Sequence, residues 1–482
     1  MTNTPQSSNC CCCSYPWIGY LFFLAVLVGT FVLGMMIVSV NERRAESTKR
    51  SVLFEVGPEE MDAAKWGRSF PRQYETWQDT QYRGGVRGAN YTGNPPTYLA
   101  GTPEFIVMFA GLGFSKEYNQ ARGHWHSITD VTKTARITDT SPASCWECKS
   151  PDAVRLINQM GREAFNAKTF HELKDQVKHS ISCYDCHDET TLALRSLRPA
   201  VLEGFKNVGQ DMNALTYQEK RSAVCAQCHS TYHLAEGTNV VTFPWSKESP
   251  ESPWESGLTA ERIEEYYKET NFSDWTNPIS GVRMIKIRHA DYELYTASTH
   301  YARNVSCADC HLPYKTEGAE KFSDHHIRSP LADVAGTCAV CHRWSEDDSK
   351  KMVRLVQQKV KDAQDRGKTM LARAHFDIAA CMEAGATDDE LKSVREELRY
   401  AQMHWDFIAS ANGKGFHAPQ ESNRILTTAL DRAAGVRIAC AKILAKHGYT
   451  DEVVYPNYSS RSRADAVVKQ FVEGERPSLL KK

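Results

Sequence analysis

Five pairs of cysteines between residues 145 and 341 share the spacing Cys-x-x-Cys, and four of them are followed directly by histidine. In such a run, both thiols can form thioethers with a porphyrin while the adjacent imidazole ligates the haem iron. A single pair could equally be a redox disulfide or half of a zinc site, but the repetition favours haem. We therefore predict five covalent haems c, attached through Cys145 and Cys148, Cys183 and Cys186, Cys225 and Cys228, Cys307 and Cys310, and Cys338 and Cys341.

The first pair differs from the others because it is followed by Lys149, whereas the others are followed by His187, His229, His311 and His342. An amine binds a metal only when deprotonated, so this lysine needs its pKa lowered by the iron and by burial. The alternative is a surface lysine beside a decayed motif. A unique proximal ligand on one haem indicates that this haem has a different task.

The histidine content allows for that division of labour. The chain has 17 histidines, so the four proximal ligands leave enough to supply distal ligands to the same four haems. Haems that transfer electrons are usually six-coordinate, and the Lys149 haem would then keep an open face for substrate. Spacing alone does not identify the distal ligands.

Several segments resemble the ammonia-forming cytochrome c nitrite reductases, from about residue 54 to about residue 448. These are 122–124 (Arg-Gly-His), 145–152 (Cys-Trp-Glu-Cys-Lys-Ser-Pro-Asp), 243–245, 272–277, 286–289 (Lys-Ile-Arg-His), 323–327 and 415–419 (Gly-Phe-His-Ala-Pro). The resemblance implies a mainly α multihaem cytochrome fold with a haem-filled core. It also implies six-electron reduction of nitrite to ammonium at the lysine-ligated haem, fed by four bis-histidine haems.

The same resemblance implies a distal ligand for each relay haem: His124 for the Cys225/Cys228 haem, His300 for the Cys338/Cys341 haem, His417 for the Cys307/Cys310 haem, and His325 for the Cys183/Cys186 haem. His326 remains an alternative to His325. Over the open face of the Lys149 haem it implies Arg136, Tyr232 and His289. A guanidinium and an imidazolium would supply positive charge for a small anion, and the tyrosine a hydroxyl donor.

One departure from the family pattern concerns calcium. Many members bind calcium beside the active site through a glutamate before the tyrosine, a lysine carbonyl, and a glutamine before the histidine. Around Tyr232, Lys286 and His289, the glutamate and glutamine positions are Thr231 and Arg288. Calcium prefers carboxylate charge, so we expect calcium to be absent and the Arg288 guanidinium to take its place. The alternative is that Arg288 points to solvent and the metal persists with fewer ligands.

The N-terminal region predicts a membrane anchor within residues 1–45. Residues 16–40 are uncharged and apolar, which is long enough to span a bilayer. Haem of this type is attached outside the cytoplasmic membrane, so we expect the rest of the chain on the periplasmic side. Arg43, Arg44, Lys49 and Arg50 oppose the positive-inside tendency, and removal by signal peptidase remains an alternative. The run Cys10 to Cys13 has no explanation.

The remaining elements must position the haems. We expect a pentahaem catalytic domain of short helices and turns at 46–345, long helices at 346–450, and a tail at 451–482. Thr387-Asp-Asp-Glu390 predicts a capping box at the start of one long helix. The resemblance implies that these helices pair two subunits in a homodimer, and that a quinol-oxidising membrane cytochrome donates electrons. The net charge of −1 argues against nucleic acid as a partner.

Two alternatives to this function remain. A non-catalytic electron relay would need five haems but no charged pocket. Hydroxylamine, nitric oxide or sulfite could also be the main substrate, because each is a small ligand of an electron-rich iron.

Overall fold

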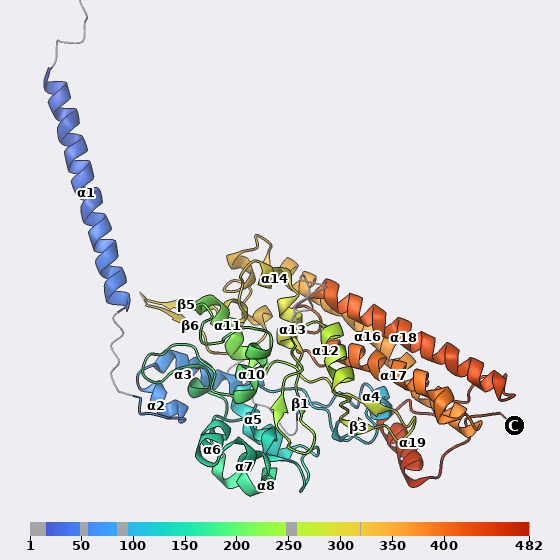
Figure 1. Cartoon of the computed structure of the whole chain (residues 1–482). Helices are drawn as coiled ribbons and strands as arrows, with labels where there is room; N and C mark the ends of the chain where they lie inside the picture. The colour runs from blue at the N-terminus through green and yellow to red at the C-terminus, as the bar shows by residue number, and fades with distance from the viewer. Residues whose placement is uncertain (1–15, 49–55, 84–94, 247–257, 319, 482) are drawn as a thin grey trace, which may run out of the picture. The chain divides into compact units, whose positions relative to one another are not determined.

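The computed structural model describes residues 16–48, 56–83, 95–246, 258–318 and 320–481 (Figure 1). It divides into two units, residues 1–55 and 56–482, which we describe separately. The run Cys10 to Cys13 and the basic residues Lys49 and Arg50 lie outside the described residues.

The first unit contains α1 (Pro16–Thr48). Its stretch Trp17–Asn41 has a mean hydropathy of 2.7, and none of that window is buried within the protein. A helix of this length and composition can cross a bilayer, as expected from the sequence, although a signal sequence near an N-terminus has the same properties.

The second unit begins with a long region of short elements. Its helices are α2 (Ala63–Gly67), α3 (Pro71–Gln78), α4 (Glu104–Met108), α5 (Ser127–Lys133), α6 (Asp152–Met160), α7 (Arg162–Asn166), α8 (Phe170–Leu173), α9 (Cys183–Cys186), α10 (Pro199–Asn207), α11 (Tyr217–Ala226), α12 (Ala260–Glu269), α13 (Asp291–Thr296), α14 (Thr299–Ala302) and α15 (Cys307–His311). Three antiparallel pairs of strands join them: β1 (His233–Leu234) with β2 (Val241–Thr242), β3 (Trp275–Thr276) with β4 (Arg283–Met284), and β5 (Tyr314–Glu317) with β6 (Glu320–Ser323). The expected irregular region is thus present.

Two of the cysteine motifs form single helical turns, α9 and α15, fixed by their own sequence. In α9, the Ser182 N–H at the start of the turn donates to the Asp185 carboxylate at 2.8 Å. In α15, the Ser306 N–H donates to Asp309 at 2.7 Å in the same arrangement. In α15 the Asp309 N–H also donates to Ser306 Oγ at 3.3 Å, which completes a capping box. Residues three apart lie on one face of a helix, so each turn presents both thiols to the same side.

Three long helices follow, α16 (Glu346–Glu383), α17 (Asp388–Ala409) and α18 (Pro419–Lys446), and a shorter α19 (Arg461–Glu473) ends the chain. The predicted capping box is present, since the Glu390 N–H donates to Thr387 Oγ1 at 3.3 Å and the Thr387 N–H to the Glu390 carboxylate at 2.9 Å. The expected long helices are confirmed.

The long helices pack against one another along their length, as the orange and red ribbons in Figure 1 show. They share one apolar core that includes Phe376, Trp405 and Leu426 and extends to α12 and to the β3–β4 hairpin. At the start of α16 the apolar pattern is only partly covered: Val360 is buried, but Met352 and Leu355 are 42% and 49% exposed. That end of α16 therefore presents apolar side chains to solvent in this chain.

Candidate active site and haem sites

The structure brings together four pairs of imidazoles, each with one member directly after a Cys-x-x-Cys motif and the other from a distant segment. Their ring centroids lie 6.4 Å apart for His124 and His229, and 6.3 Å apart for His187 and His325, His300 and His342, and His311 and His417. These are the four pairs that the resemblance implies. His325, rather than His326, lies opposite His187.

The spacing of each pair fits a haem iron between the two rings. Two metal–nitrogen bonds of about 2 Å each, together with the two ring radii, span about 6 Å. In three of these histidines Nδ1 faces a backbone carbonyl: His187 and Leu192 O at 3.0 Å, His311 and Arg328 O at 2.8 Å, and His325 and Ser323 O at 2.8 Å. An Nδ1–H that donates to a carbonyl leaves Nε2 with its lone pair for a metal. The donor set therefore suits axial ligation.

Contacts between cysteines bring three of the five motifs together. The thiol of Cys148 lies beside that of Cys228, and the thiol of Cys225 lies beside that of Cys307. The first, third and fourth motifs are therefore adjacent in space, although they are well separated in the sequence.

The lysine motif begins within a short 3-10 turn, Ala143–Trp146, which is held by aromatic packing. The Trp146 ring stacks on Phe170 with centroids 3.9 Å apart, and its Nε1 donates to the Phe170 carbonyl at 3.1 Å. Ser127 Oγ donates to the Lys149 carbonyl at 2.7 Å. These contacts fix the backbone of Lys149 while its side chain stays only partly buried.

His289 occupies a strained position near this motif. Its φ of 52° is unusual for a residue other than glycine, and such strain gathers at functional sites. Burial lowers the pKa of His289 to about 3. The ring is therefore neutral at neutral pH, which differs from the imidazolium expected from the sequence. Its Nδ1 is buried without a partner among the described residues, so it can bond to a ligand.

Arg136 and Tyr232 each connect to the 286–289 segment through one intervening side chain. The Arg136 guanidinium lies 4.5 Å from the centroid of the Phe114 ring, and the Lys286 ammonium lies 4.9 Å from the same centroid. Thr134 Oγ1 accepts a hydrogen bond from Arg136 Nε at 3.2 Å. The Arg288 guanidinium faces the Tyr232 ring at 5.4 Å. Phe114 and Arg288 thus connect these candidates to the 286–289 segment.

The Arg288 guanidinium points into the protein rather than to solvent. It donates to the Tyr232 carbonyl at 3.1 Å, to the Lys286 carbonyl at 2.9 Å and to the Asp274 carboxylate at 2.6 Å. Burial acts to lower the pKa of Arg288, but Asp274 raises it above its usual value, so the side chain is charged. A cation therefore bridges the two segments that carry Tyr232 and His289.

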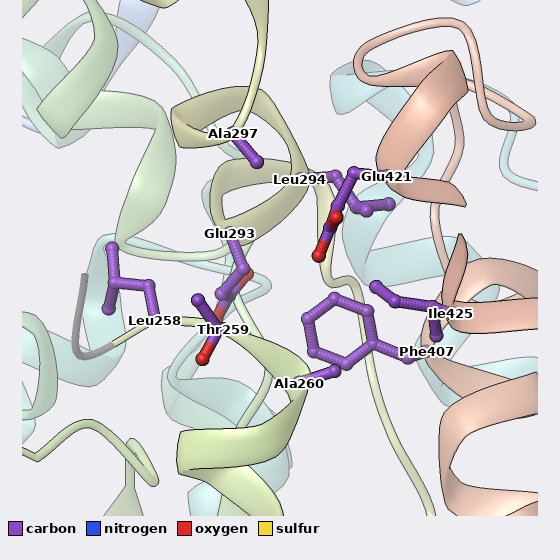
Figure 2. Close-up of a pocket in the computed structure, with 9 residues that line it drawn as sticks. All are labelled: Leu258, Thr259, Ala260, Glu293, Leu294, Ala297, Phe407, Glu421 and Ile425. Atoms are coloured by element: carbon purple, nitrogen blue, oxygen red, sulfur yellow. The ribbon is translucent and has the colours of Figure 1, made fainter. Parts of the chain in front are cut away.

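The buried carboxyl group of Glu293 is bonded to the backbone next to Tyr232. Glu293 accepts hydrogen bonds from the Thr231 N–H at 2.8 Å and from Trp245 Nε1 at 2.9 Å. Burial raises the pKa of Glu293 to about 8, so this group is largely protonated at neutral pH. Figure 2 shows that Glu293 lines a small cavity together with Glu421 and Phe407. None of the residues that line it is a candidate haem ligand.

Sequence reasoning missed three carboxylates that organise the site. Asp274 holds Arg288, Asp406 holds Lys286 at 2.8 Å, and Asp291 lies against two of the paired histidines. Asp274 stands within the recognised 272–277 segment, which was the available signal. Asp406 and Asp291 carry no local signal, because their partners come from distant parts of the chain.

The family model described as Cytochrome c552 matches residues 62–478. This chain belongs to the cytochrome c552 family. It is 40% identical over 473 residues to cytochrome c-552 of Parabacteroides distasonis, with 95% of this chain and 93% of the relative covered. It is 39% identical over 470 residues to cytochrome c-552 of Bacteroides fragilis, with the same coverage. Membership of this family confirms that the chain is a c-type cytochrome, as expected, and implies haem c iron as its cofactor.

The fold of this cytochrome c552 matches a solved structure of the cytochrome c nitrite reductase of Desulfovibrio desulfuricans. The TM-score is 0.72 at 27% identity, over 81% of this chain and 88% of the other. The mainly helical multihaem cytochrome fold expected from the sequence is thereby confirmed. That structure is described as having two calcium sites in its catalytic subunit.

Proposed function

We propose that this cytochrome c552 reduces nitrite to ammonium at a haem ligated by Lys149, with four bis-histidine haems supplying the electrons. The observation that carries the proposal is the set of four imidazole pairs at 6.3 to 6.4 Å, which leaves the lysine motif as the exception among five. The likeness to a cytochrome c nitrite reductase supports the choice of nitrite.

The bound haem supplies the redox chemistry, and the protein side chains handle the charge and the protons. Arg136 provides a permanent positive charge for the nitrite anion. The neutral His289 offers a ring nitrogen, and Tyr232 offers a hydroxyl whose pKa burial raises, so both groups can donate hydrogen bonds. Removing one such group typically costs about 3 to 4 kcal/mol in a water-excluded site.

The adjacent motifs support an order for the electron relay. With Cys148 beside Cys228 and Cys225 beside Cys307, electrons would reach the Lys149 haem through the Cys225/Cys228 haem, itself next to the Cys307/Cys310 haem. The remaining two haems would then serve as outer entry points.

The proposed function is tested by measuring ammonium formed per nitrite consumed by the purified holoprotein with a low-potential donor. We expect a ratio near one, because six-electron reduction leaves no other nitrogen product. A protein whose haems are all reducible but which consumes no nitrite would be an electron relay instead. Faster turnover of hydroxylamine, nitric oxide or sulfite than of nitrite would change the main substrate.

We further propose that the Arg288 guanidinium replaces calcium. Its hydrogen bonds to the carbonyls of Tyr232 and Lys286 put a fixed cation between the two segments that calcium would join. Wild-type activity is therefore expected to be unchanged by a chelator, whereas Arg288→Gln is expected to lower it about 10- to 100-fold. Arg283→Gln is the matched control, because Arg283 lies in β4, shortly before Arg288, but bonds to Asn271 and Ser273. Loss of wild-type activity with chelator and its return with calcium would contradict this assignment.

The proposal extends to location and partners. We propose that α1 anchors the protein to the cytoplasmic membrane, with the haem domain on the periplasmic side and a quinol-oxidising membrane cytochrome as donor. The exposed Met352 and Leu355 at the start of α16 support a homodimer through the long helices. The mass of the protein without its anchor, measured in solution, tests the dimer, and a monomer at micromolar concentration would exclude it.

A further inference from the structure

The paired histidines differ in what their second ring nitrogen faces. In His187, His311 and His325 it faces a neutral backbone carbonyl. In His229 and His417 it faces a carboxylate instead, and the carboxylate is the same one. His229 Nδ1 lies 3.7 Å from Asp291 Oδ2, and His417 Nδ1 lies 3.4 Å from Asp291 Oδ1. These two histidines belong to different pairs.

Asp291 is held so that both of its oxygens keep these positions. The side chain is 6% exposed. Oδ2 accepts a hydrogen bond from Asn412 Nδ2 at 3.0 Å, and Oδ1 accepts one from the Gly413 N–H at 3.2 Å. Each oxygen therefore has one neutral donor from the loop after α17 and one imidazole. The Asp291 N–H also donates to the His289 carbonyl at 2.7 Å, which connects this carboxylate to the pocket histidine.

A carboxylate next to a ligating imidazole makes that ligand more electron-donating and places negative charge near the iron. Both effects stabilise the ferric state, which carries the larger positive charge, and so lower the reduction potential. A backbone carbonyl exerts the same influence more weakly, because it has no net charge. In the His187 and His325 pair, the Nδ1 of each ligand faces a backbone carbonyl.

We propose that Asp291 is a positioning residue shared by two haems, which lowers the reduction potentials of the Cys225/Cys228 haem and the Cys307/Cys310 haem together. This inference rests on the haem ligation given under the proposed function. The motifs of these two haems are adjacent. The buried charge of Asp291 therefore sets the reduction potentials of two neighbouring haems relative to those of the other haems. Electron flow toward the Lys149 haem then depends on a residue that ligates no iron.

The test is a potentiometric titration of the holoprotein, followed by the absorption of the haems, with Asp291→Asn. This change keeps the size and one acceptor oxygen but removes the charge. Two haem potentials are expected to rise, while those of the other haems stay at their wild-type values. Asp377→Asn is the matched control, since Asp377 is a buried carboxylate bonded to Arg437 and Tyr455 in the long helices. It is expected to move no haem potential.

A second variant keeps the test decisive if Asp291→Asn does not incorporate haem. Asn412→Ala removes the neutral donor from Oδ2, so more of the carboxylate charge acts on His229, and the potential of the Cys225/Cys228 haem is expected to fall. Unchanged potentials in a holoprotein of either variant would overturn the inference while leaving the proposed function intact. A wild-type ferric spectrum without low-spin bis-histidine haem would instead overturn the ligand assignment, and this inference with it.

Discussion

Lys149→His is expected to lower the rate of nitrite reduction by about 100-fold. This is the upper end of the loss of activity that substitutions around a metal site typically cause. The identity of the axial ligand is a principal control on haem electronics, and the substitution would give the catalytic haem the same proximal ligand as the other four. The site would then lose the property that separates it from a relay haem. The measurement is ammonium formation by the holoprotein with saturating donor.

The matched control for this change is Lys168→His, a lysine on the loop before α8 that pairs with Glu172 at the surface. It is expected to keep the wild-type rate, because exposed ion pairs contribute little. A Lys149→His protein that holds all its haems and still forms ammonium at the wild-type rate would show that catalysis does not depend on the amine ligand.

Lys286→Met is expected to lower the free energy of unfolding by about 3 to 5 kcal/mol, because it leaves a buried carboxylate without its partner. Lys286 and Asp406 are 1% and 0% exposed, and the ammonium lies 2.8 Å from both carboxylate oxygens. Burial lowers the pKa of Lys286 and raises that of Asp406, while their mutual attraction opposes both changes. Denaturant unfolding of the holoprotein measures the loss.

Two further variants separate the pair from general damage. The double variant Lys286→Met, Asp406→Leu is expected to recover most of the lost stability, because replacing both members of a buried pair by apolar groups removes the unpaired charge. Lys446→Met, which breaks a surface pair with Glu390, is expected to change the free energy of unfolding by less than about 0.5 kcal/mol. Equal losses in the Lys286 and Lys446 variants would show that the buried pair has no special weight.

The sequence alone predicted the features that depend on local patterns. The five Cys-x-x-Cys motifs are spacings of near neighbours in the sequence, so they needed no knowledge of the fold. The long helices followed from their apolar period, and the Thr387 capping box from residues within one turn. The apolar span of α1 needed only length and composition. The lysine in the first motif was visible for the same reason, since its neighbours in the sequence are its neighbours in space.

The distal histidines depended on resemblance, because nothing near His417 in the sequence indicates that it lies opposite His311. Only the tertiary structure decided that Arg288 points inward to Asp274, that His289 is neutral, and that Asp291 serves two histidines at once. Each of these depends on which distant segments pack together and on how much water they exclude. Burial and the pairing of charges are properties of the assembled chain, so no local pattern of residues encodes them.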